Sequence, residues 1–152
     1  MLAAVQRVKN AEVIIDGKIH SSIGNGLLVL LGIRKGDSEE EVKYISRKLT
    51  ELRIFSDIND KMNLNVKDTG GEILIISQFT LCADTAKSGN RPSFTNAEIP
   101  EKAEFLYEKT KSELAKLYSP EKIKSGVFAA KMDVSLTNSG PVTILIEKKI
   151  YE

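Results

Sequence analysis

The sequence has few of the residues that most often carry catalysis or bind metals. Its 152 residues include one cysteine, Cys82, and one histidine, His20. A single cysteine excludes a disulfide within the chain and any metal site built from several cysteines. We therefore expect neither redox chemistry nor structural zinc.

The chain also lacks an excess of charge and a long apolar run. Its 22 basic and 21 acidic side chains give a net charge of +1, so no global field indicates a nucleic-acid partner, although local basic patches remain open. No apolar run approaches the about 20 residues that span a bilayer, and the opening MLAAVQRVKN lacks the apolar core of a secretory signal. We expect a cytoplasmic protein with no membrane contact.

The first half of the chain predicts strands followed by one helix. The segments AAVQRV and AEVIID are typical of two short strands, with Asp16-Gly17 as a hairpin turn. Residues 27–33, LLVLLGI, are apolar at consecutive positions, which predicts a central strand. Ser38 and Glu41 have the spacing of a capping box. The helix that they begin carries one apolar stripe, formed by Val42, Ile45, Leu49 and Leu52.

The middle of the chain predicts a second strand between two loops. Residues 57–71 are rich in Asn, Asp and Gly and are typical of a loop, whereas EILIISQFTL over residues 72–81 predicts another buried strand. The polar segment 82–96 contains Gly89 and Pro92 and is long enough for a functional loop.

The last third predicts a helix and a strand pair. The helix runs from Pro100 to Leu117. Its inner face is formed by Ala103, Leu106 or Tyr107, Thr110, Leu114 and Leu117. Alternation over residues 128–136 predicts a strand, and VTILIEK after Gly140-Pro141 is expected to pair back with it. The fold class is therefore α/β, a single compact domain over residues 1–152 in which layered β-sheets pack with two amphipathic helices.

Familiar catalytic arrangements find little support in the sequence. A Ser-His-Asp triad or a Cys-His dyad would have to use His20, which lies in a polar turn segment and is far in sequence from other reactive residues. The segment DINDKMN lacks the glycine and the closing glutamate of a calcium loop, so no metal is expected.

Two stretches remain as candidates for a site. Ser77 to Thr80, SQFT, place two hydroxyls and an amide at the end of a buried strand, where polar groups need partners or a ligand. Pro141 follows Gly140, and about 5% of such bonds are cis in folded proteins, usually in a tight turn. The pair is either a plain hairpin corner or a functional wedge.

These stretches and others together resemble the D-aminoacyl-tRNA deacylase family, formerly called D-tyrosyl-tRNA deacylase. The resemblance rests on SQFTL, GNRPSF and NSGPVT, together with AAVQRV, GLLVLLGI, RIFSD, KMNLNV and VFAAKMDVSL, and it runs from end to end in the family's order. It implies a homodimeric hydrolase of the α/β class that uses no metal and no cofactor. Its substrate would be the ester that joins a D-amino acid, or glycine mischarged on the alanine tRNA, to the 3′ adenosine of tRNA.

The resemblance also implies roles for particular residues. Residues matching Ser77, Gln78, Phe79 and Thr80 line the aminoacyl pocket of the family. The Gly140-Pro141 pair matches a Gly-cis-Pro motif that one subunit inserts into the other's active site, where it excludes L side chains. The carried-over substrate-binding residues are Phe79, Gly140, Pro141, Phe128, Ala130, Met132, Arg91 and Phe94.

Other parts of the implied site stay open. Ser139 stands where an acidic residue is expected in the family's motif, which changes a local charge or turn contact. Arg91 either meets a phosphate or makes a surface ion pair. A basic rim for tRNA would draw on cations that are equally typical of an ordinary surface: Lys87, Arg91, Lys122, Lys124 and Lys131.

The catalytic step has two readings. In the first, Thr80 is a nucleophile, which needs an activating base. In the second, Thr80 positions the ester together with Ser77 and Gln78, backbone N–H groups stabilise the oxyanion, and the ribose 2′-hydroxyl helps to activate water. We favour the second, because no histidine lies in the matching segments. The competing functions are a nucleic-acid-binding module without catalysis and a hydrolase of small esters with a Thr80 or Cys82 nucleophile.

Overall fold

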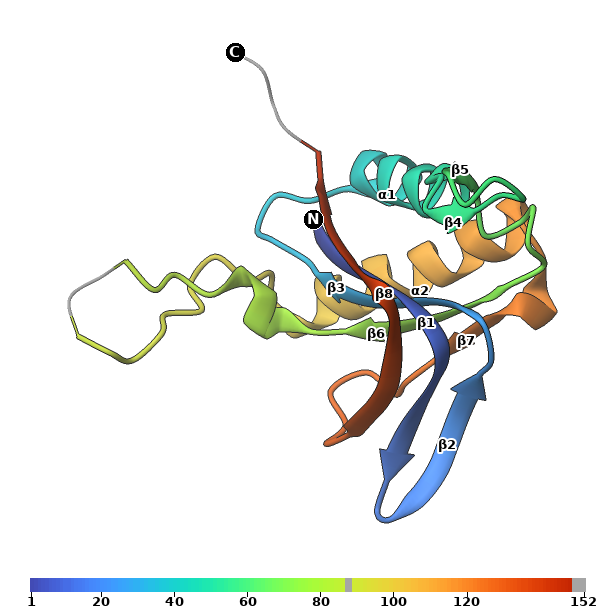
Figure 1. Ribbon diagram of the computed structural model, residues 1–152. Helices are drawn as coiled ribbons and strands as arrows, with labels where there is room; N and C mark the ends of the chain where they lie inside the picture. The colour runs from blue at the N-terminus through green and yellow to red at the C-terminus, as the bar shows by residue number, and fades with distance from the viewer. Residues whose placement is uncertain (87–88, 149–152) are drawn as a thin grey trace.

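The computed structural model describes residues 1–86 and 89–148, and its main element is a mixed sheet (Figure 1). The strands of this sheet are β1 (Leu2–Ile15), β2 (Lys18–Ile23), β3 (Gly26–Gly32), β6 (Glu72–Ser77), β7 (Ile123–Ser125) and β8 (Asp133–Glu147). Their order is β2-β1-β3-β6-β7, and β8 also pairs with β1. The remaining elements are β4 (Phe55–Ser56), β5 (Met62–Leu64), α1 (Glu39–Glu51), α2 (Pro100–Leu117) and the 3₁₀ turns η1 (Phe79–Cys82) and η2 (Pro120–Lys122).

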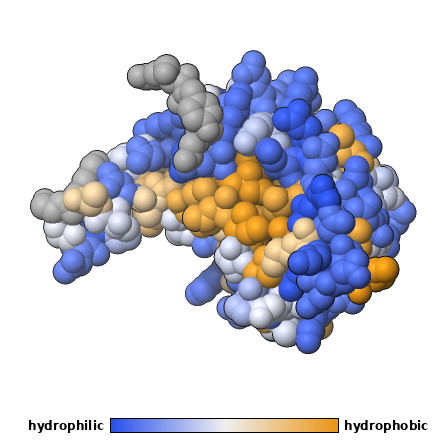
Figure 2. All heavy atoms as spheres, turned by 45° about the horizontal axis from the view of Figure 1, so that its top comes forward, coloured by the Kyte–Doolittle hydropathy of each residue, from blue (hydrophilic) through white to orange (hydrophobic). Residues whose placement is uncertain are grey.

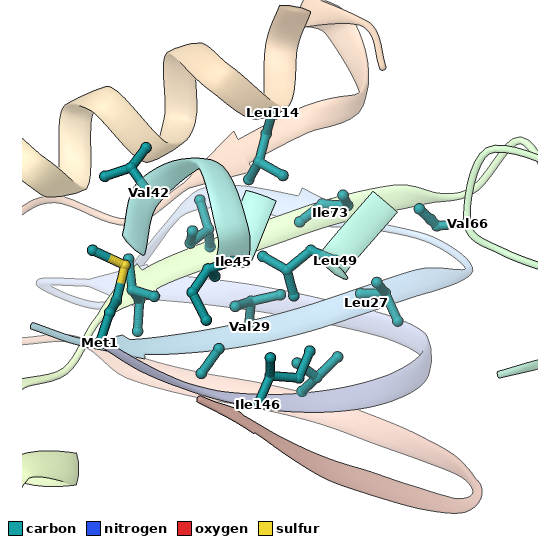
Figure 3. Close-up of a cluster of buried hydrophobic side chains, with 14 of the residues drawn as sticks. Met1, Leu27, Val29, Val42, Ile45, Leu49, Val66, Ile73, Leu114 and Ile146 are labelled. Carbon is teal, nitrogen blue, oxygen red and sulfur yellow. The ribbon is translucent and has the colours of Figure 1, made fainter. Parts of the chain in front are cut away.

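Both helices cover one face of the sheet (Figure 1). The apolar stripe of α1 packs there against alternate residues of β1, β3 and β6, as Figure 3 shows for Ile45, Leu49, Val29 and Ile73. Because β3 lies between β1 and β6, the prediction of a central strand is confirmed. The α/β class with two helices on layered strands is confirmed as well. None of the described helices is long and apolar enough to cross a membrane.

The predicted helix ends are confirmed, and one face prediction is wrong. Ser38 and Glu41 form the capping box of α1, and Pro100 is the first residue of α2. Leu106 and Tyr107 are both buried, so α2 presents a wider apolar face than a single stripe. Leu117 is 37% exposed, because it is the last helical residue and lies beyond the packed part of the helix.

The first strand is one long element, so the prediction of two short strands is wrong. Pairing along β1 is irregular between Gln6 and Val8 and again between Val8 and Asn10. Such an irregularity reverses which side chains face the core. Ala3 and Val5 accordingly lie in the cluster beneath the helices, whereas Ala11 and Val13, which are also odd-numbered, belong to a second cluster on the other face. In the sequence, the polar residues Lys9 and Asn10 interrupt the apolar pattern, which is why the segment resembled two short strands. The Asp16-Gly17 turn is confirmed.

The Gly140-Pro141 pair lies in a bulge of β8, and the predicted hairpin is wrong. Both halves of β8 pair with β1, with Asn138 opposite Val8 and Thr143 opposite Gln6. Residues 139–142 are therefore looped out, and the peptide bond between Gly140 and Pro141 is cis. The Asn138 side chain spans the bulge, since its oxygen accepts from the Val142 N–H at 2.8 Å.

Two other regions differ from the prediction. Residues 57–71 include β5, which pairs with β4 as a small separate sheet, so this segment is not wholly a loop. Residues 128–132 precede β8 and form a turn, although their alternation is typical of a strand. Short strands and turns of this kind depend on tertiary partners that a local pattern does not contain.

A second apolar cluster lies on the face of the sheet opposite the helices. Among the described residues, the buried members of this cluster all come from strands, including Val8, Leu28 and Leu74, and Met132 packs against them from the turn before β8. Leu145, Ala4 and Leu30 are paired side by side, so their side chains share this face, and Leu145 is 68% exposed. Figure 2 shows hydrophobic residues gathered in one area, which begins where the segment containing η1 projects from the sheet and continues over the adjoining surface. We name the row Leu145, Ala4 and Leu30 the open sheet face.

Tyr107 gives the core a titratable group and a test of its packing. Its hydroxyl donates to the Ile75 carbonyl at 2.9 Å, and burial raises the pKa of the phenol to about 12. The unfolded phenol ionises near pH 10, so this contribution to stability is complete below pH 10 and is lost as the pH rises toward 12. We expect Tyr107→Phe to lower the free energy of unfolding by about 1 kcal/mol at pH 7, with a smaller difference above pH 10. Denaturant titrations at both pH values measure this, with Tyr44→Phe on α1 as the control. A difference that grows above pH 10 would contradict it.

Candidate active site

A cavity of ≈ 670 Å³ opens where β6 ends. Its walls come from η1, from the segment before α2 and from the turn before β8. Eight of the sequence-predicted site residues line it: Ser77, Gln78, Phe79, Thr80, Phe94, Phe128, Ala130 and Met132. The structure thus brings together three segments that lie far apart in the sequence.

The chain turns away from the sheet immediately after Ser77. The Gln78 N–H still donates to the Leu31 carbonyl at 2.8 Å, and η1 then begins. Gly32 permits this turn, because a Cβ there would lie 2.9 Å from the Leu81 Cβ. The strand predicted to reach Leu81 therefore ends four residues earlier, since η1 packs against the end of β3.

Gln78 orients the hydroxyl of Thr80. The Gln78 amide donates to the Thr80 oxygen at 2.9 Å, which leaves the hydroxyl proton of Thr80 available to a ligand. Within residues 1–86 and 89–148, no imidazole, amine or carboxylate lies within hydrogen-bonding distance of this hydroxyl. A 3₁₀ turn also leaves its first N–H groups without carbonyl partners inside the turn, and here these belong to Phe79 and Thr80.

Aromatic side chains form the walls of the cavity. The rings of Phe79 and Phe94 meet edge to face with centroids 5.1 Å apart, and Phe79 is 58% exposed. Phe128 also lines the cavity, and its ring centroid lies 6.1 Å from that of Tyr107, which joins this part of the wall to the core. An exposed aromatic pair beside a cavity is suited to stacking against a planar ligand.

The turn before β8 supplies the remaining wall. Ala129 has a φ of 63°, and the Ala130 N–H donates to the Val127 carbonyl at 3.1 Å. Met132 folds back over Gly126, where a Cβ would lie 2.6 Å from the Met132 sulfur. The glycine is thus required by a close approach, and the strand predicted from Phe128 begins only at Asp133.

Gly140 and Pro141 do not line the cavity of their own chain. They are exposed on the β8 bulge, and Arg7 on β1 holds this bulge in place. The Arg7 Nε donates to the Ser139 carbonyl at 2.9 Å, and another of its nitrogens donates to the Ile54 carbonyl at 2.8 Å. Ser139 thus takes part through its backbone.

The predicted basic rim is only partly described by the structure. Arg91 is exposed but does not line the cavity, and the Lys122 ammonium donates to the Gly70 carbonyl at 3.0 Å. Lys124 is half-buried and Lys131 is exposed, and Lys87 lies outside the described residues.

Sequence reasoning missed two charged residues that line the cavity, Lys35 and Glu98. Glu98 accepts backbone N–H bonds from Ile99 at 3.0 Å and Gly36 at 3.2 Å, and Lys102 lies 3.0 Å away. These contacts lower the pKa of Glu98 below its ordinary value. No local motif marks either residue, because the two segments meet only through tertiary pairing.

The alternative nucleophiles do not assemble at the cavity. His20 is exposed on β2 and does not line it. Cys82 is buried, its sulfur lies 3.6 Å from the Ile33 carbonyl, and burial raises the pKa of the thiol. In the part of the chain that the structure describes, no three His, Cys, Asp or Glu side chains gather as a metal site.

Comparisons of the sequence agree on one family. A family profile described as D-Tyr-tRNA(Tyr) deacylase matches residues 4–147. A D-aminoacyl-tRNA deacylase of Persephonella marina is 51% identical over 149 residues, which cover 98% of this chain and 99% of that protein. A D-aminoacyl-tRNA deacylase of Carboxydothermus hydrogenoformans is 49% identical over 147 residues, with 97% and 99% covered.

Solved structures match over the same extent. A structure named c-Myc DNA Unwinding Element Binding Protein has a TM-score of 0.93 and 43% identity, covering 99% of this chain and all of that one. A probable eukaryotic D-amino acid tRNA deacylase has a TM-score of 0.80 at 13% identity, covering 95% and 97%, and it shows the shared fold. With the cavity, these matches lead to one assignment: the chain belongs to the D-Tyr-tRNA(Tyr) deacylase family.

Proposed function

We propose that the chain hydrolyses the ester bond of D-aminoacyl-tRNA and releases the free D-amino acid and tRNA. The observation that carries this proposal is the cavity at the end of β6, in which the family's SQFT segment presents an oriented hydroxyl and two backbone N–H groups beside an aromatic wall. The names of the relatives support the same reaction. As a step of translation quality control, it would take place in the cytoplasm.

The proposed chemistry relies on orientation. The ester carbonyl lies against the N–H groups of Phe79 and Thr80, which stabilise the negative charge that develops on its oxygen. Thr80 donates its hydroxyl proton to the substrate, with Gln78 fixing its rotamer and Ser77 at the end of β6 beside them. The ribose 2′-hydroxyl helps to activate water, which attacks the carbonyl carbon and forms a tetrahedral intermediate. The bond to the 3′ oxygen then breaks, and that oxygen takes up the proton that the water released.

The remaining cavity residues contact the terminal adenosine and the amino acid. Phe79 and Phe94 offer ring edges and faces to the base, and Phe128, Ala130 and Met132 form the opposite wall. Arg91 lies in the segment between η1 and α2 that also contains Phe94, and its exposed guanidinium can bind a phosphate.

Discrimination between D and L substrates needs a second copy of the chain. The open sheet face exposes an apolar row, and pairing two such faces would bury it in a homodimer. In that dimer the Gly140-Pro141 bulge of one subunit enters the cavity of the other, which it does not reach in its own chain. The Gly140 carbonyl then occupies the space that an L side chain needs. Glycine has no side chain to exclude, so an alanine tRNA that is mischarged with glycine is also a substrate.

Hydrolysis of D-tyrosyl-tRNA by the purified chain, with a metal chelator present, tests the proposed reaction. Release of free D-tyrosine under multiple turnover is the expected result. A second candidate, a nucleic-acid-binding module, is favoured by the name of the 43% identical structure, which calls that protein a DNA unwinding element binding protein. That candidate predicts salt-sensitive tRNA binding with an intact ester, and this outcome would reject the hydrolase.

Substitution of Thr80 separates the two catalytic readings. We expect Thr80→Ala to retain about 1–10% of the rate on D-tyrosyl-tRNA, because it loses one positioning hydrogen bond. Loss of a nucleophile would cost on the order of 10⁴-fold or more. Single-turnover rates measure the difference, with Thr80→Ser as the control that keeps the hydroxyl. A covalent aminoacyl adduct on Thr80, detected by mass spectrometry, would sink the positioning role.

A further inference from the structure

A second, smaller cavity lies on the other side of η1 from the candidate active site. It has a volume of ≈ 270 Å³ and is lined by Arg34, Lys35, Leu81, Cys82, Ala83 and Asn96. Lys35 lines both cavities. Phe79 and Thr80, at the start of η1, line the first, whereas Leu81 and Cys82 line the second, so this one turn forms the ridge between them.

The polar side chains around the second cavity include two cations. Arg34, Lys35 and Asn96 all supply N–H donors, and no carboxylate is among the lining residues. Arg34 is partly neutralised by Glu147, 2.8 Å away, which lies outside the cavity. Lys35 is exposed, and within the described part of the chain no carboxylate lies within ion-pair distance of its ammonium group.

The backbone that carries Lys35 is held in place by several hydrogen bonds. The Lys35 N–H donates to the Asn96 carbonyl at 3.0 Å, and the neighbouring Arg34 N–H donates to Asp37 at 2.7 Å. Glu98 is an acidic residue that lines the first cavity, but its carboxylate already accepts two N–H bonds and pairs with Lys102. A cation whose backbone is held between two cavities, with the nearby carboxylate already paired, is suited to bind an anionic linkage that joins two ligand groups.

We propose that Lys35 and the second cavity bind the phosphodiester that precedes the terminal nucleoside of the substrate. The single-stranded 3′ end then runs from the second cavity over η1, with its last nucleoside in the first cavity. This inference rests on the proposed function and extends it to the next unit of the nucleic acid. Lys35 is a positioning residue for binding and does not touch the reacting ester.

Two substrates that differ in this phosphate test the proposal. D-Tyrosyl-tRNA contains it, whereas 3′-O-D-tyrosyl-adenosine ends at the ribose. We expect Lys35→Ala to raise KM for the tRNA about five- to tenfold with kcat unchanged, and to reduce the slope of log KM against log salt by about 1. Lys35→Arg keeps the charge and is expected to restore most of the affinity. Because Lys35 also lines the first cavity, Lys35→Ala is expected to raise KM for the adenosine ester as well, but by a clearly smaller factor than for the tRNA. Lys43→Ala on α1 is the matched control for an exposed lysine.

The outcomes separate this inference from the proposed function. An equal loss on both substrates, an unchanged KM for the tRNA, or an equal loss in Lys43→Ala would overturn the role of Lys35. If the wild-type chain cleaves neither ester, the proposed function fails, and binding of uncharged tRNA measured by fluorescence anisotropy then decides the inference. Weaker binding by Lys35→Ala with rescue by Lys35→Arg supports it, and equal binding by all variants rejects it.

Discussion

A Leu145→Asp variant is expected to be monomeric and to hydrolyse D-tyrosyl-tRNA at least about 100-fold more slowly than the wild type. Leu145 is the most exposed residue of the open sheet face, beside Ala4 and Leu30. In a dimer that buries this row, an unpaired carboxylate costs several kcal/mol, and about 2.7 kcal/mol already corresponds to 100-fold. Activity falls when dimerisation is lost, because the partner's bulge also closes the cavity around the substrate and holds the ester in position, and a lone chain has no Gly140-Pro141 bulge in its cavity.

The molecular mass in solution and the single-turnover rate, both measured on the same preparation, test this prediction. Phe105→Asp is the matched control, since Phe105 is 53% exposed but stands on α2, in the layer opposite the open sheet face. The control is expected to remain dimeric and active. A monomeric Leu145→Asp variant with full activity would show that each cavity works alone, and a dimeric variant would place the interface elsewhere.

Arg7→Ala is expected to lower the rate on D-tyrosyl-tRNA about 100-fold while leaving the fold intact. Arg7 joins the Ser139 and Ile54 carbonyls, so its removal releases the bulge that carries Gly140. A displacement of about 1 Å in a positioning group can cost on the order of 100-fold in rate. The discrimination against L-tyrosyl-tRNA should fall with it, because a mobile bulge no longer excludes the L side chain.

Two variants separate this effect from a general loss of stability. Arg7→Lys keeps the charge but lacks the planar fork that reaches two carbonyls, so an intermediate loss is expected. Lys9→Ala changes an exposed cation on the same strand and should have no effect. Equal rates for Arg7→Ala and the wild type, at equal free energies of unfolding, would mean that the bulge needs no support from Arg7.

Local signals in the sequence predicted the elements whose causes are local. The capping box at Ser38 and Glu41 and the proline at the start of α2 act within one turn of a helix, so their spacing identifies them. The run over residues 27–33 is apolar throughout because β3 lies in the middle of the sheet, which was also predictable.

The mistaken elements depend on distant partners. The β8 bulge exists because β1 continues past it and Arg7 holds it, and neither fact can be read from NSGPVT. The early end of β6 and the turn before β8 similarly require Gly32 and Gly126 to admit side chains from other segments. Alternating apolar residues looked the same whether they paired in a strand or lined a cavity.

The candidate site was predicted mainly through resemblance. Composition and spacing marked Ser77 to Thr80 only as polar groups at a strand end, and they left Gly140-Pro141 open between a corner and a wedge. The structure then brought eight predicted residues to one cavity and placed Gly140, Pro141 and Arg91 outside it. Lys35 and Glu98 escaped prediction because their segments meet through tertiary contacts, including the isolated pairing of Arg34 with Ala97, that no local pattern contains.

The most direct test of the central claim is the ratio of single-turnover rates on D-tyrosyl-tRNA and L-tyrosyl-tRNA. The same wild-type preparation, tRNA and salt concentration are used for both, so only the chirality of the amino acid differs. We expect the D ester to be cleaved at least about 100-fold faster, since exclusion of a side chain by fixed backbone is a steric clash. Equal cleavage of both esters would contradict chiral exclusion by the Gly140-Pro141 bulge.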